Sequence, residues 1–294
     1  MKKIAFILLF SQLAFAGNRI YYKTNLTRII PKSNRSQLAY LGGPVISNVK
    51  IISVMWGSSV DKTVSGQVGG FYSTIVNSSY MDWLSEYNTN ITATNGHQGT
   101  NQTIGRGTFS GVYTITPSTG NATAVDDSAI QSELAAQIAA GHLPANSDDT
   151  LYMVSFPAGV TISLTFGGST AYSCQEFCAY HNSGHAGSGN LYYGVLPDFS
   201  GACSSGCGNN DMFSNYTAAA SHEITEAITD PQVGDTPGNT VDYPMAWYDS
   251  AGGEIGDICV GTTASLPGSN GSNYTVQGEW SNKQNACVST AHGL

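Results

Sequence analysis

Residues 221–231, SHEITEAITDP, contain histidine and glutamate at a spacing that suits a metal site. His222 and Glu226 are four positions apart, so an α-helix places them on one face, where both can bind a single ion. The order differs by one residue from the zinc-peptidase motif H-E-x-x-H, in which the glutamate after the first histidine accepts a proton from water. We therefore predict His222 and Glu226 as metal ligands and Glu223 as the general base. Asp230 lies about two turns beyond His222 and is a further candidate for this site.

A plain amphipathic helix is the alternative explanation of this segment. Ala218, Ile224 and Ala227 already form an apolar stripe that such a helix can bury. Both glutamates would then lie on a solvated face, and the helix would form without a metal. Pro231 ends the helix in either case, which makes Asp230 an ordinary helix-end residue under this alternative.

A second group of carboxylates follows in residues 246–259, AWYDSAGGEIGDIC. Asp249, Glu254 and Asp257 share a glycine-containing loop that can bend to bring their oxygens together. We predict Glu254 and Asp257 as metal ligands that complete the helix site; a polar surface turn is the alternative. The predicted cofactor is Zn²⁺, which binds both imidazole nitrogen and carboxylate oxygen. Several carboxylates around one ion favour harder cations, so Ca²⁺ and Mn²⁺ are the alternatives, although the EF-hand spacing is absent.

Residues 174–185, CQEFCAYHNSGH, add His181 and His185. They are four residues apart, but Gly184 between them favours a loop over a helix. Each histidine can be a ligand, a substrate contact or a structural residue. We keep His181 as the stronger additional candidate for the site.

The six cysteines predict disulfide bonds rather than thiols if the chain is exported. Their spacing predicts two tight local bridges and one longer bridge: Cys174–Cys178, Cys203–Cys207 and Cys259–Cys287. A zinc site built from the first four cysteines is the alternative.

The first residues of the chain predict export. A charged start and a short apolar run precede Ala14-Phe15-Ala16, the pattern of a signal peptide and its cleavage site. We predict a signal peptide over 1–16, a basic arm over 17–40, and secretion to the extracellular space or, in a Gram-negative cell, the periplasm. No later apolar run is long enough to span a membrane. The net charge of −9 argues against nucleic acid as a partner.

The hydrophobic pattern predicts mixed secondary structure. The expected elements are a strand over 49–56, helical structure over 63–87 with a break at 77–79, a strand over 111–116, a helix within 126–144, and a hairpin of 150–156 with 160–166. We predict an α+β (or α/β) single globular domain over 41–294. It has a zincin-like active-site helix and a loop-rich, disulfide-stapled C-terminal part.

Several segments, taken in order, resemble the exordium or phosphate-induced-protein family of secreted plant proteins and their bacterial relatives. The similar segments are GGPVISNVKIISVMWG, MDWLSEY, SCQEFCAYH, SHEITEAITDP, AWYDSAGGEIGDICVG and VQGEWSNKQNACV. The resemblance supports the Cys259–Cys287 pair. It also implies one recurring pattern that joins His222, Glu226, Glu254 and Asp257. It says little about a reaction, and the second C-x-x-x-C segment departs from the plant pattern.

Together these observations predict a secreted zinc-dependent hydrolase, most simply a peptidase, that acts on a peptide or cell-surface polymer. The alternative is a non-catalytic secreted module, in which a metal fixes the C-terminal loops and exposed Trp and Tyr bind cell-wall or surface glycans. The two differ at the metal, because an enzyme needs an open coordination position and a structural site does not. A helix without metal is the third interpretation.

Overall fold

The computed structural model describes residues 20–22, 36–166, 168–233, 241–269 and 271–290. The signal peptide predicted over 1–16 lies outside the described residues. Of the predicted basic arm, residues 20–22 and 36–40 are described, and Leu38 and Tyr40 are buried. The last residues of the arm are therefore part of the folded body.

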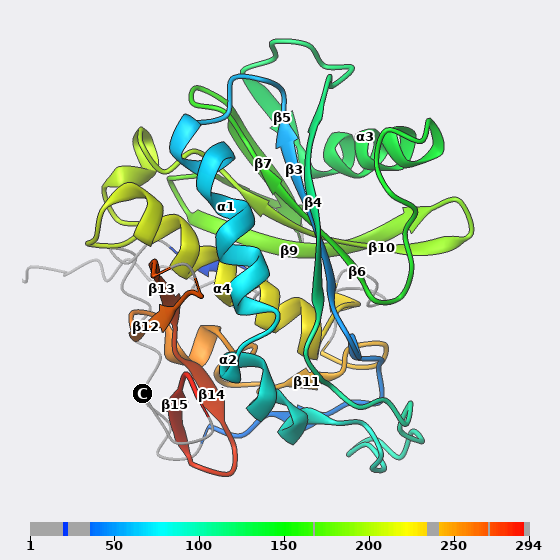
Figure 1. Ribbon diagram of the computed structural model, residues 1–294. Coiled ribbons are helices and arrows are strands. Elements are labelled where there is room, and N and C mark those ends of the chain that lie inside the picture. The colour runs from blue at the N-terminus through cyan, green and yellow to red at the C-terminus, as the bar shows by residue number, and fades with distance from the viewer. Residues whose placement is uncertain (1–19, 23–35, 167, 234–240, 270, 291–294) are drawn as a thin grey trace, which may run out of the picture.

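A six-stranded mixed sheet forms the centre of the fold (Figure 1). In spatial order its strands are β1 (Ile20–Tyr22), β9 (Phe177–Ala186), β10 (Gly189–Leu196), β6 (Thr150–Ser155), β3 (Lys50–Trp56) and β4 (Thr108–Ile115). The last four strands run parallel, and β9 runs antiparallel to both of its neighbours. Every residue of β6 is buried because both faces of the sheet are covered.

Helices cover both faces of this sheet (Figure 1). One face carries α1 (Lys62–Ile75) and α4 (Met212–Thr229), and the other carries α3 (Asp127–Ala139) with a small sheet of β5 (Ala124–Asp126), β7 (Thr161–Phe166) and β8 (Ser169–Tyr172). Side chains along β3 alternate between the two cores. Ile51 and Met55 belong to the core under α1 and α4, whereas Ile52 and Val54 belong to the core under α3. The sheet thus separates two hydrophobic cores.

The C-terminal part packs on α4 as short strands joined by loops. Its elements are β11 (Trp247–Tyr248), η5 (Asp257–Cys259), β12 (Thr263–Pro267), β13 (Asn273–Gln277), β14 (Glu279–Ser281) and β15 (Ala286–Val288). The remaining short elements are β2 (Ala39–Tyr40), α2 (Ser79–Asp82), η1 (Trp83–Tyr87) and η2 (Ala202–Ser204). The prediction of a mixed α and β domain with a loop-rich, disulfide-linked C-terminal part is confirmed.

The predicted hairpin is wrong, although both of its strands exist. β6 pairs with β3 and β10 in the central sheet, whereas β7 pairs with β5 and β8 in the small sheet. The run Leu151–Val154 is wholly apolar, which suits a strand that is buried on both faces and has parallel neighbours. The two segments therefore separate at the turn between them, instead of pairing across it.

Two of the three predicted disulfides are wrong. The bonds are Cys174–Cys203, Cys178–Cys207 and Cys259–Cys287. Only the third had been predicted correctly; in the other two, each cysteine of the first C-x-x-x-C segment bonds its counterpart in the second segment. These bonds join the start of β9 to the loop before α4, because the two segments lie side by side in the fold. They also leave no thiolate for a zinc site of four cysteines.

Three disulfides indicate that the chain folds in an oxidising compartment. Within the described ranges, no helix combines the length and apolar character that crossing a membrane requires. Secretion itself stays a prediction.

Peptide mapping under non-reducing conditions tests the disulfide connectivity. Cleavage after Glu176 and after Asp198 places Cys174, Cys178 and the pair Cys203 and Cys207 on three separate peptides. We expect the Cys174 fragment and the Cys178 fragment each to stay bonded to the peptide that contains Cys203 and Cys207. Local bridges would instead join the two fragments to each other and leave that peptide unattached. The third disulfide is the internal control, because both connectivities contain it.

Candidate metal centre

The predicted metal motif lies on α4, in the interior of the protein. Asp211 caps the start of this helix by accepting hydrogen bonds from the backbone N–H groups of Phe213 and Ser214. Every residue from 215 to 229 is buried. The alternative with solvated glutamates is therefore wrong, because the C-terminal part covers the face that an amphipathic surface helix would expose.

His222 and Glu226 face each other across one turn of α4. His222 Nε2 lies 3.0 Å from Glu226 Oε1, and both side chains are fully buried. Gly256 lies directly against them: a Cβ added to it would lie 2.4 Å from His222 Nδ1 and 2.9 Å from Glu226 Oε1. The backbone N–H of Asp257 donates to Glu226 Oε1 at 3.1 Å. The loop that carries Glu254 is thus packed onto the motif.

His181 supplies a second imidazole from the central sheet. The loop expected around Gly184 is wrong, because β9 continues through this glycine. His181 Nε2 lies 3.1 Å from Glu254 Oε1 and 3.7 Å from Glu226 Oε2. His185, on the same strand, is exposed and lies outside the site. The strand therefore delivers one of the two histidines to the motif on α4.

Glu223 lies on the side of α4 that meets the sheet. Gly194, the β10 partner of His181, lies beneath the helix, and a Cβ added to it would lie 3.7 Å from Glu223 Cβ. A Cβ at this position would collide with Met153 on the neighbouring strand β6, 2.7 Å from its Sδ, whereas its approach to Glu223 is an ordinary van der Waals contact. Glu223 forms a group with His222 and Glu226, in which one donor atom of each residue lies within 4.8 Å of the others.

A second group of the same kind consists of His181, Glu226 and Glu254. Imidazole nitrogen and carboxylate oxygen suit Zn²⁺, and Mn²⁺ also accepts carboxylates. The sequence motif alone placed one imidazole, that of His222, beside several carboxylates. The folded centre contains two imidazoles, because His181 joins it. Two histidines and one glutamate is a ligand composition that catalytic zinc sites use. The donors therefore fit a divalent transition metal.

Asp257 and Asp230 lie beside these donors, but neither belongs to a three-donor group among the described residues. Asp257 Oδ2 accepts a hydrogen bond from the backbone N–H of Glu254 at 3.1 Å and so closes the turn that presents Glu254. Asp230 Oδ1 accepts from the backbone N–H of Ala246 at 2.8 Å, where α4 ends. Both carboxylates hold the backbone around the centre.

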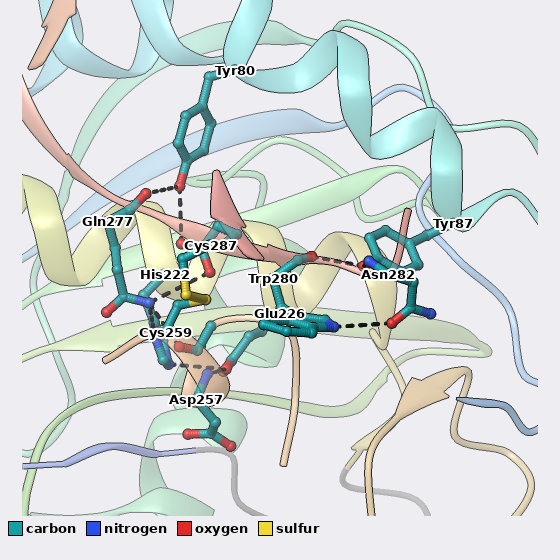
Figure 2. Close-up of a disulfide and its surroundings, with 12 residues drawn as sticks. Tyr80, Tyr87, His222, Glu226, Asp257, Cys259, Gln277, Trp280, Asn282 and Cys287 are labelled. Atoms are coloured by element: carbon teal, nitrogen blue, oxygen red, sulfur yellow. Dashed lines mark hydrogen bonds and ion pairs between the residues drawn. A yellow bond between two sulfur atoms is a disulfide. The ribbon is translucent and has the colours of Figure 1, made fainter. Parts of the chain in front are cut away.

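Sequence reasoning missed three residues near His222: Gln277, Tyr80 and Glu279. Figure 2 shows the first two. Gln277 Nε2 lies 2.9 Å from His222 Nδ1 and donates to the backbone oxygen of Gly256 at 2.9 Å. The Tyr80 hydroxyl lies 2.9 Å from Glu279 Oε1 and 2.7 Å from the backbone oxygen of Gln277. The sequence did contain a signal for two of them: in residues 276–280, VQGEW, the polar Gln277 and Glu279 alternate with other residues as on one face of a strand. These residues form a buried polar layer that holds the imidazole.

The centre concentrates buried carboxyl groups. They are those of Glu223, Glu226, Asp230, Glu254, Asp257 and Glu279. Among the described residues, no lysine or arginine is buried. A carboxyl group in a protein interior is stabilised by hydrogen bonds, by a proton or by a cation.

Burial shifts the ionisation of this cluster toward neutral forms. Loss of water raises the pKa of Glu226 and of Glu254 well above the ordinary value, and neighbouring carboxylates add to the rise in Glu254. Burial also raises the pKa of Glu279 to about 7. It lowers the pKa of His222, since desolvation outweighs the nearby carboxylates. A divalent ion would replace the protons that these shifts favour.

The donors are closed off from the surface. His222, Glu223, Glu226 and Glu254 each have 0% of their surface exposed. Three cavities, of about 410, 550 and 410 Å³, are lined by other residues. The first of them lies where β3, β4 and β6 end, and none of the three touches the centre. The structure therefore holds these side chains in a closed state.

No protein-family model, curated protein or solved structure matches this chain. The resemblance to the exordium family accordingly stays a prediction. The chemistry of the centre follows from its own donors, distances and burial.

Gly256→Ala tests the close packing of the C-terminal loop on the motif. Gly256 has φ −80° and ψ −39°, which alanine adopts readily, so the effect is steric. The added Cβ would collide with His222 and Glu226, and overpacking of this kind costs about 1–3 kcal/mol. We expect a lower Tm in thermal unfolding and weaker metal binding by calorimetry. Gly66→Ala is the control: its Cβ meets nothing within 4 Å on a helix, so an equal loss there would contradict this account.

Metal-free protein should lose stability as the pH rises. The pKa of Glu279 is about 7 in the folded protein against 4.5 ordinarily, so folding favours its protonated form. The contribution of Glu279 to the free energy of unfolding is complete below its ordinary pKa of 4.5, and it is lost as the pH rises through the folded-state pKa of about 7. At about 1.4 kcal/mol per pKa unit, this residue alone accounts for roughly 3 kcal/mol. We expect the Tm in chelator to fall from about pH 5 to about pH 8 in calorimetry.

Glu279→Gln is the matched control for this pH dependence, because the amide keeps the side-chain shape but does not ionise. Its Tm should decline less steeply over the same range. The lowered pKa of His222 acts in the opposite direction, since its contribution is lost as the pH falls. A Tm that rises with pH in the metal-free protein would contradict the ionisation described above.

Proposed function

We propose that this protein is a metal-dependent hydrolase, most simply a secreted peptidase, whose ion is held by His222 and Glu226 together with His181 and Glu254. The observation that carries the proposal is the meeting of two buried imidazoles at one glutamate, from a helix and a strand far apart in the chain. A bound divalent ion lowers the pKa of a coordinated water and polarises a substrate carbonyl. The three disulfides are consistent with action outside the cytoplasm.

Glu223 is the general base in this proposal. It follows His222 directly, and one of its oxygens lies within 4.8 Å of a donor atom of His222 and of Glu226, which supports this role for a water that the ion would hold. Gln277 is a positioning residue, because its side-chain amide lies 2.9 Å from Nδ1 while Nε2 faces Glu226. An ion at Nε2 requires the ring proton on Nδ1, so the amide would then present its oxygen to Nδ1–H.

A non-catalytic module stabilised by a metal is the second candidate. Complete burial of the donors favours it, because a structural metal site needs no open coordination position. The ion would then attach the C-terminal loops to α4 through Glu254. Glycan binding through exposed tryptophan has little support, since three of the four tryptophans are buried. Tyr172 and Tyr243 are the large aromatic side chains most exposed in the described part of the chain.

Glu223→Gln distinguishes the two candidates. Metal content is measured by mass spectrometry on protein purified without chelator, and turnover is measured on a mixed peptide library. In a hydrolase, the variant should keep its metal, because glutamine preserves the shape of the side chain. Its turnover should fall about 10²- to 10⁴-fold, because the general base is lost. Glu176→Gln, far from the centre in a surface turn, is the control and should change neither quantity.

Full turnover in Glu223→Gln would contradict its role as a base. Stoichiometric metal that raises the Tm, without hydrolysis of any peptide by the wild type, would favour the structural module. Wild-type protein that binds no metal after incubation with Zn²⁺ or Mn²⁺ would contradict both candidates.

A further inference from the structure

The two donor groups of the centre share one residue, Glu226. His222 and Glu223 belong to one group, and His181 and Glu254 belong to the other. The two histidines lie against different oxygens of the shared carboxylate. His222 Nε2 is 3.0 Å from Oε1, whereas His181 Nε2 is 3.7 Å from Oε2. A carboxylate that presents one oxygen to each of two donor sets has the arrangement of a bridging ligand.

We infer that the centre binds two divalent cations bridged by Glu226. The inference rests on the proposed function for the presence of a metal, and it divides the four proposed ligands between two ions instead of one. The first ion is held by His222 and Glu226 Oε1, with Glu223 beside it. The second ion is held by His181, Glu254 and Glu226 Oε2.

The second oxygen of Glu226 supports the second ion independently. Oε2 is fully buried and accepts no hydrogen bond within the described residues. Buried carboxylate oxygens normally accept hydrogen bonds or bind cations. Oε1, by contrast, already accepts the backbone N–H of Asp257 at 3.1 Å. The oxygen that still needs a partner is therefore the one nearer His181.

A pair of ions also suits hydrolysis. Two metal ions about 3.5–4 Å apart can stabilise both the attacking and the leaving oxygens of a displacement, as in aminopeptidases and phosphatases. One bridging carboxylate can span that separation with its two oxygens. Glu223 keeps its role as base, because it lies in the group of the first ion.

Titration of the metal-free protein with Mn²⁺ tests the second ion. Native mass spectrometry should count two ions per wild-type chain, and electron paramagnetic resonance should show the spectrum of an exchange-coupled pair. His181→Ala and His222→Ala should each bind one ion, with the spectrum of an isolated ion. Glu226→Ala should lose the coupling. His185→Ala is the matched control, because this histidine lies on β9 outside the site, and it should keep both ions.

One ion per wild-type chain, with the spectrum of an isolated Mn²⁺, would overturn the second site and leave the metal-dependent hydrolase in place. Absence of any bound ion would overturn both proposals. The wild-type count and spectrum do not depend on the variants, so a variant that fails to fold does not weaken the test.

Discussion

A cluster of buried carboxyl groups around α4 is the constraint on which the rest of this structure depends. Such groups can remain in the interior only if they are protonated, hydrogen-bonded or bound to cations. The elements around α4 are arranged to satisfy them: a strand brings His181, a loop brings the backbone N–H of Asp257, and β13 brings Gln277. The hydrophobic cores on the two faces of the sheet supply a rigid frame in which this polar layer can exist.

Close approach of backbone to the helix makes the layer compact. Gly256 lets the C-terminal loop lie against the imidazole of His222. Two of the disulfides, Cys174–Cys203 and Cys178–Cys207, tie the start of β9 to the loop before α4. The third, Cys259–Cys287, ties β15 to η5, the element whose Asp257 N–H donates to Glu226 (Figure 2). The disulfides and the close packing at glycine thus both fix the positions of the strand, helix and loop that carry the candidate ligands.

The closed state connects metal binding to the stability of the C-terminal part. Glu254 belongs to a loop that also covers the motif, so an ion bound there would join the loop to α4 and to β9 at once. The same loop would have to move for a polymer to reach the ion. A structural role and a catalytic role would therefore both involve this loop. The fold does not distinguish them; whether the centre binds an ion, and whether that ion keeps an open coordination position, does.

Sequence alone determined the local features: the helix that carries His222 and Glu226, because i and i+4 share a helical face, and the loop that carries Glu254. It did not determine which distant segments meet those residues. The role of His181 depends on the pairing of β9 with β10, and the cysteine partners lie 29 residues apart in each of the two corrected bonds. Local spacing decides which residues share a helix face, whereas only the packing of sheet, helix and loop decides which distant side chains meet them.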